Sequence, residues 1–155
     1  MVISVSFKKE GSSFYDMKGD YTILDQPYRN AMTLVCGEFD RRGVEYAVIG
    51  GGAVQIQIVN AIEEPEKLTD LLRRTGDIDI VVDAPIEEMV LMFNELASEG
   101  RASNSIKGKP RVGNVSINYL VPGELKGVDH KLSLEESEYK RISGTQVHVE
   151  TPEMI

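Results

Sequence analysis

Residues 73–82 read Arg-Arg-Thr-Gly-Asp-Ile-Asp-Ile-Val-Val, and this stretch decides how the rest of the chain is interpreted. Its apolar, β-branched positions predict a strand over 77–82. Successive side chains of a strand point to opposite faces, so Asp77 and Asp79 share one face. Two adjacent carboxylates repel each other and are costly to bury unless a cation neutralises them, and hard oxygen ligands suit Mg²⁺. The pair is therefore a candidate metal site; the alternative is a solvent-facing pair on a half-exposed strand.

A glycine turn lies upstream of this strand. Residues 45–49 predict a short buried strand, and Gly50, Gly51 and Gly52 follow it directly. Bare backbone N–H groups at the start of a helix can hold a phosphate, helped by the helix dipole, although a triple glycine is also compatible with a purely structural turn. The run does not match a P-loop or a dinucleotide-binding fingerprint, since Gln55 stands where the third glycine of the latter belongs. Together, the turn and the carboxylates suggest phosphate transfer from a nucleotide.

The remaining sequence predicts an α+β protein, with helices packed on a mixed β-sheet. Hydrophobic spacing and stop signals predict helices over 27–42, 51–62 and 85–99, and helical turns within 63–75 and 133–140. Strands are expected over 2–8, 45–49, 77–82 and 145–150, and a hairpin is expected from 102–107 and 111–120. Residues 51–62 also alternate like a strand, but the preceding glycine turn favours a helix. Residues 151–155 look like the first turn of another helix. We therefore expect an N-terminal strand and arm over 1–26 and a single core domain over 27–155.

The composition bounds the class of protein. The chain has 155 residues, of which 41% are hydrophobic, enough for one domain with its own core. The net charge of −8 argues against general nucleic-acid binding, which needs a basic face. The single cysteine, Cys36, falls in an amphipathic helical pattern, so we expect it to be a small core residue. A chain with one cysteine has no internal disulfide, which fits a reducing, cytoplasmic compartment. No apolar run approaches the roughly 20 residues of a membrane span, and the N-terminus does not read as a secretory signal.

The glycine turn and the string Arg73-x-Thr75-x-Asp77-Ile78-Asp79 together resemble the nucleotidyltransferase superfamily related to DNA polymerase β. The closest resemblance is to the branch that includes AbiEii-type toxins and similar stand-alone transferases. Members of that branch carry a strand, Gly-Gly, a helix and then Arg-x-Ser/Thr-x-Asp-apolar-Asp. The resemblance covers roughly residues 30–120 and places Gly51 and Gly52 at the Gly-Gly positions.

This resemblance implies a nucleoside triphosphate bound with Mg²⁺ in a two-metal site. Gly51 and Gly52 would lie against the phosphates, Arg73 and Thr75 would assist there, and Asp77 and Asp79 would hold the metals. An acceptor hydroxyl would attack the α-phosphate in line, and pyrophosphate would leave. The acceptor stays open between an RNA end, a protein hydroxyl and a small molecule, as do the base preference, the oligomeric state and any partner protein.

One position departs from the family pattern. The family usually carries a third carboxylate on a later strand, in an apolar-Asp-apolar setting, and the matching residue here is Asn118. An amide cannot act as a base, and Glu124 and Asp129 are the carboxylates close enough in sequence to substitute for the missing one. Three functions therefore stay open: a metal-dependent nucleotidyltransferase, a nucleotide-binding or regulatory module of the same fold without catalysis, and an α+β domain that acts through a protein interface.

Overall fold

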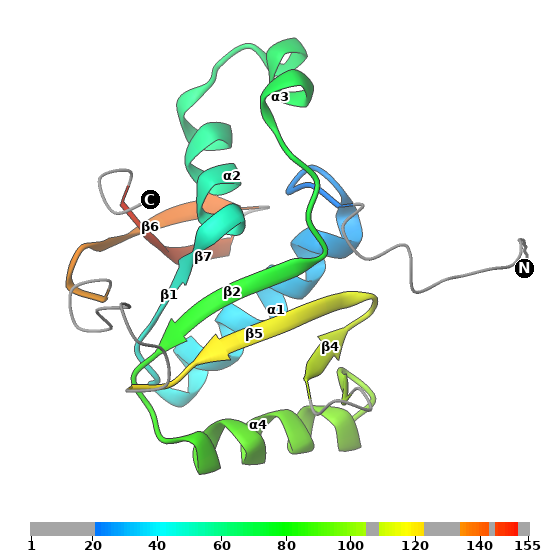
Figure 1. Ribbon diagram of the computed structural model, residues 1–155, viewed down its shortest axis with the longest axis vertical. Coiled ribbons are helices and arrows are strands. Elements are labelled where there is room, and N and C mark those ends of the chain that lie inside the picture. The colour runs from blue at the N-terminus through cyan, green and yellow to red at the C-terminus, as the bar shows by residue number, and fades with distance from the viewer. Residues whose placement is uncertain (1–20, 105–108, 123–133, 143–144, 152–155) are drawn as a thin grey trace, which may run out of the picture.

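The computed structural model describes residues 21–104, 109–122, 134–142 and 145–151. Within these ranges it has seven strands, β1 (Tyr46–Ile49), β2 (Asp77–Val82), β3 (Ser103–Asn104), β4 (Pro110–Val112), β5 (Val115–Leu120), β6 (Ser137–Ile142) and β7 (Thr145–Glu150). The helices in the same ranges are α1 (Gln26–Arg42), α2 (Gly50–Ala61), α3 (Pro65–Leu71) and α4 (Ile86–Ser98). The expected α+β architecture, with helices on a mixed sheet, is confirmed (Figure 1).

The seven strands form one sheet in the order β3-β4-β5-β2-β1-β7-β6. β2 lies at the centre, antiparallel to β1 and parallel to β5. Asp79 is opposite Ile49 of β1 and Asn118 of β5, while Asp77 is opposite Ser116. Residues directly opposite each other in a sheet point to the same face, so this register sets which side chains accompany the two aspartates.

The helix α1 packs on the sheet through one apolar stripe. Tyr28, Met32, Val35 and Phe39 recur at helical spacing and are fully buried. Gly43 ends the helix in the left-handed conformation, with φ of 71°, and its N–H donates to the carbonyl of Asp40. In Figure 1 this helix lies behind β2 and β5, and none of the described helices passes in front of these two strands. Within the described part of the chain, one broad face of the central sheet therefore has no helical cover.

Most elements agree with the sequence-based predictions. The helix over 51–62, which competed with a strand, is α2, and the acidic strand has the predicted bounds of 77–82. The helical segment within 63–75 is α3, and the helix expected over 85–99 is α4. Cys36 is fully buried in α1, as expected of a small core residue.

Two predictions need correction. The helical turn expected over 133–140 is confined to the residues before β6, where Leu134 and Glu135 are helical, because residues from Ser137 to Ile142 pair along their whole length with β7. The stretch 111–120 is not one strand, since Gly113, with φ of 62°, turns the chain between β4 and β5. In the first case, pairing with β7 decides the structure against the local sequence preference. In the second case, the left-handed conformation of Gly113 ends one strand and begins the turn to the next.

The start of the described chain belongs to the core. Tyr21 and Ile23, from the segment expected to form an arm, are buried against it. The strand expected over 2–8 and the helical turn expected over 151–155 lie wholly or mostly outside the described residues. Among the residues that the structure describes, no helix combines the length and hydrophobicity that crossing a bilayer requires.

Candidate functional site

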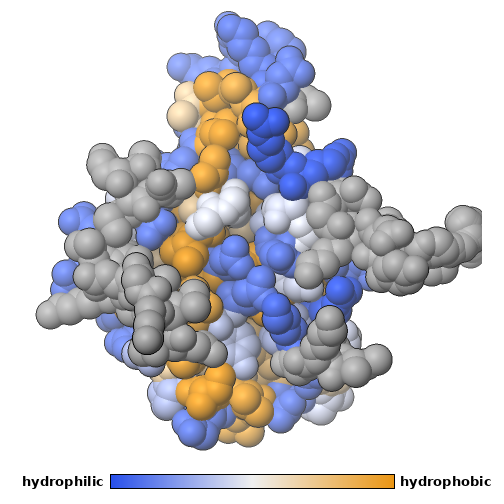
Figure 2. All heavy atoms as spheres, in the orientation of Figure 1, coloured by the Kyte–Doolittle hydropathy of each residue, from blue (hydrophilic) through white to orange (hydrophobic). Residues whose placement is uncertain are grey.

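The two aspartates of β2 point to the open face of the central sheet. Ile78 and Ile80 are fully buried on the opposite face, whereas Asp77 and Asp79 are half-buried. Figure 2, drawn from the same side as Figure 1, shows hydrophilic side chains gathered over β2 and β5, bordered by hydrophobic surface over α2 and over α4. The carboxylates therefore belong to a polar patch between two apolar borders.

Asn118 stands beside the carboxylates. It is opposite Asp79 in the parallel pair of β2 and β5, and its Nδ2 donates a hydrogen bond of 3.0 Å to Oδ1 of Asp79. The register thus places the amide where a third carboxylate would meet the pair. The amide donates a hydrogen bond to this carboxylate and adds no negative charge to the site.

The glycine turn lies directly against Asp79. Gly50 follows β1 with φ of 66°, and a Cβ built on it would stand 3.1 Å from Oδ2 of Asp79. The next glycines differ from each other. Gly51 is exposed with open space around it, whereas a Cβ on the buried Gly52 would meet the Tyr28 hydroxyl at 3.2 Å and Val48 at 3.3 Å. Gly51 leaves bare backbone at the surface, while Gly52 permits close packing of α2 on α1 and β1.

Sequence reasoning missed the closeness of Gly50 to Asp79 and the part played by Tyr28. Gly50 entered the sequence analysis only as one of three glycines in the turn, and its positive φ and its position against Asp79 now single it out. Tyr28 of α1 donates from its hydroxyl to the carbonyl of Asp77, at 2.8 Å across 49 positions of sequence. Burial, with the nearby carboxylates of Asp79 and Asp77, raises the pKa of Tyr28 well above its ordinary value, so the hydroxyl stays protonated and donating.

The segment that leads into β2 is held by the backbone. Thr75 pairs with Tyr21 through two backbone hydrogen bonds, of 3.1 and 2.6 Å, and its Oγ1 accepts from the Asp77 N–H at 3.3 Å. The buried Gln55 donates from Nε2 to the carbonyl of Arg73 at 2.9 Å and accepts from the N–H of Ile23. These bonds fix the backbone beside the carboxylates.

The two arginines of this segment are exposed. Arg74 forms an ion pair with Asp25, at 3.3 Å, which agrees with its interpretation as a surface charge. The side chain of Arg73 extends into solvent at the entrance to β2. A further basic residue, Arg111 of β4, is opposite Ser116, which is in turn opposite Asp77, so all three share the open face.

The two carboxylates and the neighbouring turn fit one hard divalent cation. In the described ranges no three acidic, histidine or cysteine side chains cluster closely enough to hold a metal, and both Glu124 and Asp129 lie outside those ranges. Two carboxylates on one face, beside a turn that a Cβ would obstruct, match the way Mg²⁺ binds through one or two carboxylates and completes its shell with phosphate oxygens and water.

The comparisons with known proteins bear on the fold. No protein-family model and no curated protein matches the chain. Among solved structures, the chain is similar to an antigenic nucleotidyltransferase-like protein from Paracoccidioides brasiliensis, with a TM-score of 0.54 and 16% sequence identity. The match covers 80% of this chain and 60% of that chain, so this chain spans less than two thirds of its neighbour. The fold is therefore nucleotidyltransferase-like.

Proposed function

We propose that this protein is a nucleotidyltransferase, which binds a nucleoside triphosphate with Mg²⁺ and moves the nucleoside monophosphate to an acceptor hydroxyl. The observation that carries the proposal is the position of Asp79, which lies against the Cβ-free turn at Gly50 and next to Asn118, on the same face as Asp77. The nucleotidyltransferase-like fold supports it.

Each group has a role in this proposal. Asp77 and Asp79 hold the divalent cation, which supplies positive charge at the attacking and departing oxygens of the phosphoryl group. Gly51 and Gly52 lie along the triphosphate at the start of α2, where backbone N–H groups and the helix dipole favour an anion. Arg73 and Thr75 assist at the entrance to β2, and Tyr28 fixes the backbone of Asp77.

The finer assignment rests on sequence. We place the protein with AbiEii-type and similar stand-alone transferases, because Arg73-x-Thr75-x-Asp77-Ile78-Asp79 follows their pattern. A cytoplasmic location fits the single buried thiol of Cys36. Arg111 shares the open face with the carboxylates and is suited to an anionic group on the acceptor.

A second candidate function is nucleotide binding without turnover. Asn118 favours it, because an amide cannot accept the proton of an acceptor hydroxyl and ligates Mg²⁺ more weakly than a carboxylate. Its hydrogen bond to Asp79 also occupies one carboxylate oxygen. Under this proposal the same site binds the nucleotide and serves a regulatory purpose.

Thermal unfolding with each nucleoside triphosphate, with and without Mg²⁺, tests the binding step. Transfer from an α-labelled nucleotide to the protein itself, to RNA and to small hydroxyl compounds tests the chemistry. A Mg²⁺-dependent rise in midpoint together with a labelled product supports the transferase. A rise without any product supports the binding module, and no rise with any nucleotide contradicts both.

A further inference from the structure

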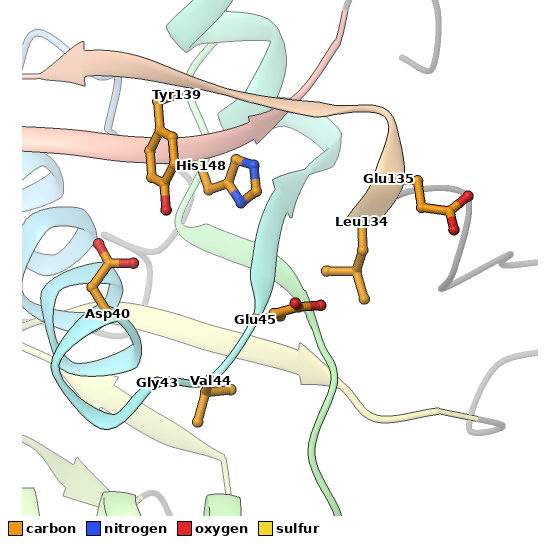
Figure 3. Close-up of a pocket in the computed structure, with 8 residues that line it drawn as sticks. All are labelled: Asp40, Gly43, Val44, Glu45, Leu134, Glu135, Tyr139 and His148. Atoms are coloured by element: carbon orange, nitrogen blue, oxygen red, sulfur yellow. The ribbon is translucent and has the colours of Figure 1, made fainter.

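A cavity lies at the opposite end of β1 from the glycine turn. It has a volume of about 470 Å³, within the range of small-molecule sites. Its walls come from the end of α1, from the residues just before β1, and from β6 and β7 (Figure 3). Val44 and Glu45 precede β1 whereas Gly50 follows it, so this cavity is separate from the carboxylates of β2.

One wall of the cavity is aromatic and held firmly. Tyr139 and His148 are opposite each other in the pair of β6 and β7, and their rings stack at 4.4 Å with an angle of 13°. His148 is fixed further, since its Nε2 lies 2.8 Å from Oγ of Ser137 and its backbone N–H donates to the Tyr46 hydroxyl at 3.0 Å. Tyr139 is 54% exposed, which leaves ring surface available to a ligand.

The charge of the cavity is negative. Asp40 and Glu45 contribute carboxylates, and among the described residues that line the cavity none is a lysine or an arginine. Figure 3 shows the Asp40 carboxylate and the Tyr139 hydroxyl pointing toward one another, Leu134 pointing toward Glu45, and Glu135 pointing away from them. Burial raises the pKa of Asp40 above its ordinary value, against the opposing effects of His148 and the Tyr46 hydroxyl.

The negative charge and the aromatic wall determine which kind of ligand the cavity favours. A phosphate or carboxylate ligand would meet like charges in the cavity and a net charge of −8 on the chain. A cation gains from the carboxylates and from the face of the Tyr139 ring. A guanidinium group fits better than an ammonium, because it is planar, stacks on aromatic rings and donates to carboxylates through a rigid fork.

We propose that this cavity binds a guanidinium cation, stacked on Tyr139 and hydrogen-bonded to Asp40 and Glu45, with Val44 and Leu134 against its alkyl stem. The same group occurs on free guanidino compounds and on arginine side chains of proteins. Agmatine represents the first source, and a capped Gly-Arg-Gly peptide represents the second. The proposal is independent of nucleotide binding at Asp77 and Asp79.

Histidine-ring NMR spectra of the full chain report directly on this cavity. The sequence has two histidines, so His130→Gln assigns the His148 resonances. We expect saturable shifts of the His148 ring with agmatine or with the peptide, and binding at least about fivefold weaker when citrulline replaces arginine in the peptide. Shifts with both probes indicate the free cation as a sufficient ligand, whereas shifts with the peptide alone indicate an arginine side chain.

Substitutions in the cavity provide the second measurement. Tyr139→Leu and Asp40→Asn should each weaken binding by at least about fivefold, because one removes the stacking face and the other a charge. Glu135→Gln, whose side chain points away from the other carboxylates, is the matched control and should change binding by less than about twofold. Equal binding of the arginine and citrulline peptides, no saturable shift with either cation, or unchanged binding in both cavity variants would overturn the proposal.

Discussion

Asn118 donates a hydrogen bond from its Nδ2 to Oδ1 of Asp79, at 3.0 Å between parallel neighbouring strands. This contact makes the amide part of the carboxylate site. Because asparagine is neutral, the site carries one negative charge fewer than a site with three carboxylates. Under the proposed function, both the number of cations that the site binds and its capacity to accept a proton therefore depend on residue 118.

The first prediction concerns Asn118→Asp. Without a divalent cation, the new carboxylate faces Asp79 at hydrogen-bond distance, and we expect a loss of about 1–2 kcal/mol of unfolding free energy from like-charge repulsion. Mg²⁺ should reverse this loss, since a third oxygen ligand strengthens cation binding. Thermal unfolding in chelator and in Mg²⁺ measures both effects. A variant as stable as the natural chain in chelator would show that the two side chains do not interact.

The second prediction concerns the carboxylates themselves. Asp77→Asn and Asp79→Asn should each weaken Mg²⁺-dependent nucleotide binding by about 100-fold or more, because each removes a charged ligand. The fold should survive, since an asparagine at position 79 still offers an oxygen to the amide of Asn118. Calorimetric titration measures the affinity. Asp83→Asn, at an exposed position just after β2, is the matched control, and an equal loss in that variant would count against a specific site.

The parts of this site that could be predicted are those that depend on the local sequence pattern. The alternation over Asp77–Val82 sufficed to place two carboxylates on one face, and the strand-to-glycine pattern sufficed to predict the turn before α2. Both inferences need only a few neighbouring residues. The choice of Asn118 rested on the family resemblance, and in the sheet this residue is opposite Asp79.

Long-range contacts explain what was missed. The bond from Tyr28 to the carbonyl of Asp77 joins two elements 49 positions apart, and the hydrophobic pattern of α1 gives Tyr28 no distinction from its buried neighbours. Similarly, the acidic sequence around Glu138 gives little local preference for a strand, and pairing with β7 decides the outcome. The roles of Gly50 and Gly52 depend on which atoms lie opposite them.

The third prediction separates two adjacent glycines. Gly50→Ala places a methyl group 3.1 Å from Oδ2 of Asp79 in a left-handed conformation, and we expect a loss of about 1–2 kcal/mol of unfolding free energy. Gly51→Ala has open space around it, so stability should stay the same or rise by up to about 1 kcal/mol. Urea unfolding measures the difference. Equal stability of the Gly50→Ala and Gly51→Ala variants would show that Gly50 does not lie close to Asp79.

The fourth prediction tests the packing of Gly52 on Tyr28. Gly52→Ala brings a Cβ to 3.2 Å from the Tyr28 hydroxyl, with Val48 also close, and should cost about 1–3 kcal/mol of unfolding free energy. Tyr28→Phe removes that hydroxyl and its bond to Asp77, at a cost of about 1 kcal/mol. In the double variant the alanine should cost less than in the natural background, because the obstructing oxygen is absent. A double-mutant cycle measures this coupling, and strictly additive costs would contradict the contact.

The fifth prediction concerns a buried carboxylate far from the proposed chemistry. Glu38 of α1 contacts Arg41 at 2.5 Å, Arg42 at 3.2 Å and Arg101 at 3.5 Å, while its side chain is only 6% exposed. The hydrogen bond from Arg41 contributes most to lowering the pKa of Glu38, against the effect of burial, with Arg42 acting in the same direction. Since Arg101 follows α4, the cluster also joins the ends of two helices.

A lowered carboxyl pKa in the folded protein stabilises it at pH values above the ordinary pKa of glutamate, and the contribution is lost as the pH falls through the lowered value. Glu38→Gln should therefore cost about 1–3 kcal/mol of unfolding free energy near neutral pH, and its difference from the natural chain should shrink on acidification. Glu64→Gln is the matched control, because its pair with Lys67 at 2.8 Å is exposed on both sides and should contribute nothing measurable. Urea unfolding across the acidic range measures both variants. A Glu38→Gln cost that stays constant with pH would show that packing, rather than the charge of Glu38, holds these helix ends together.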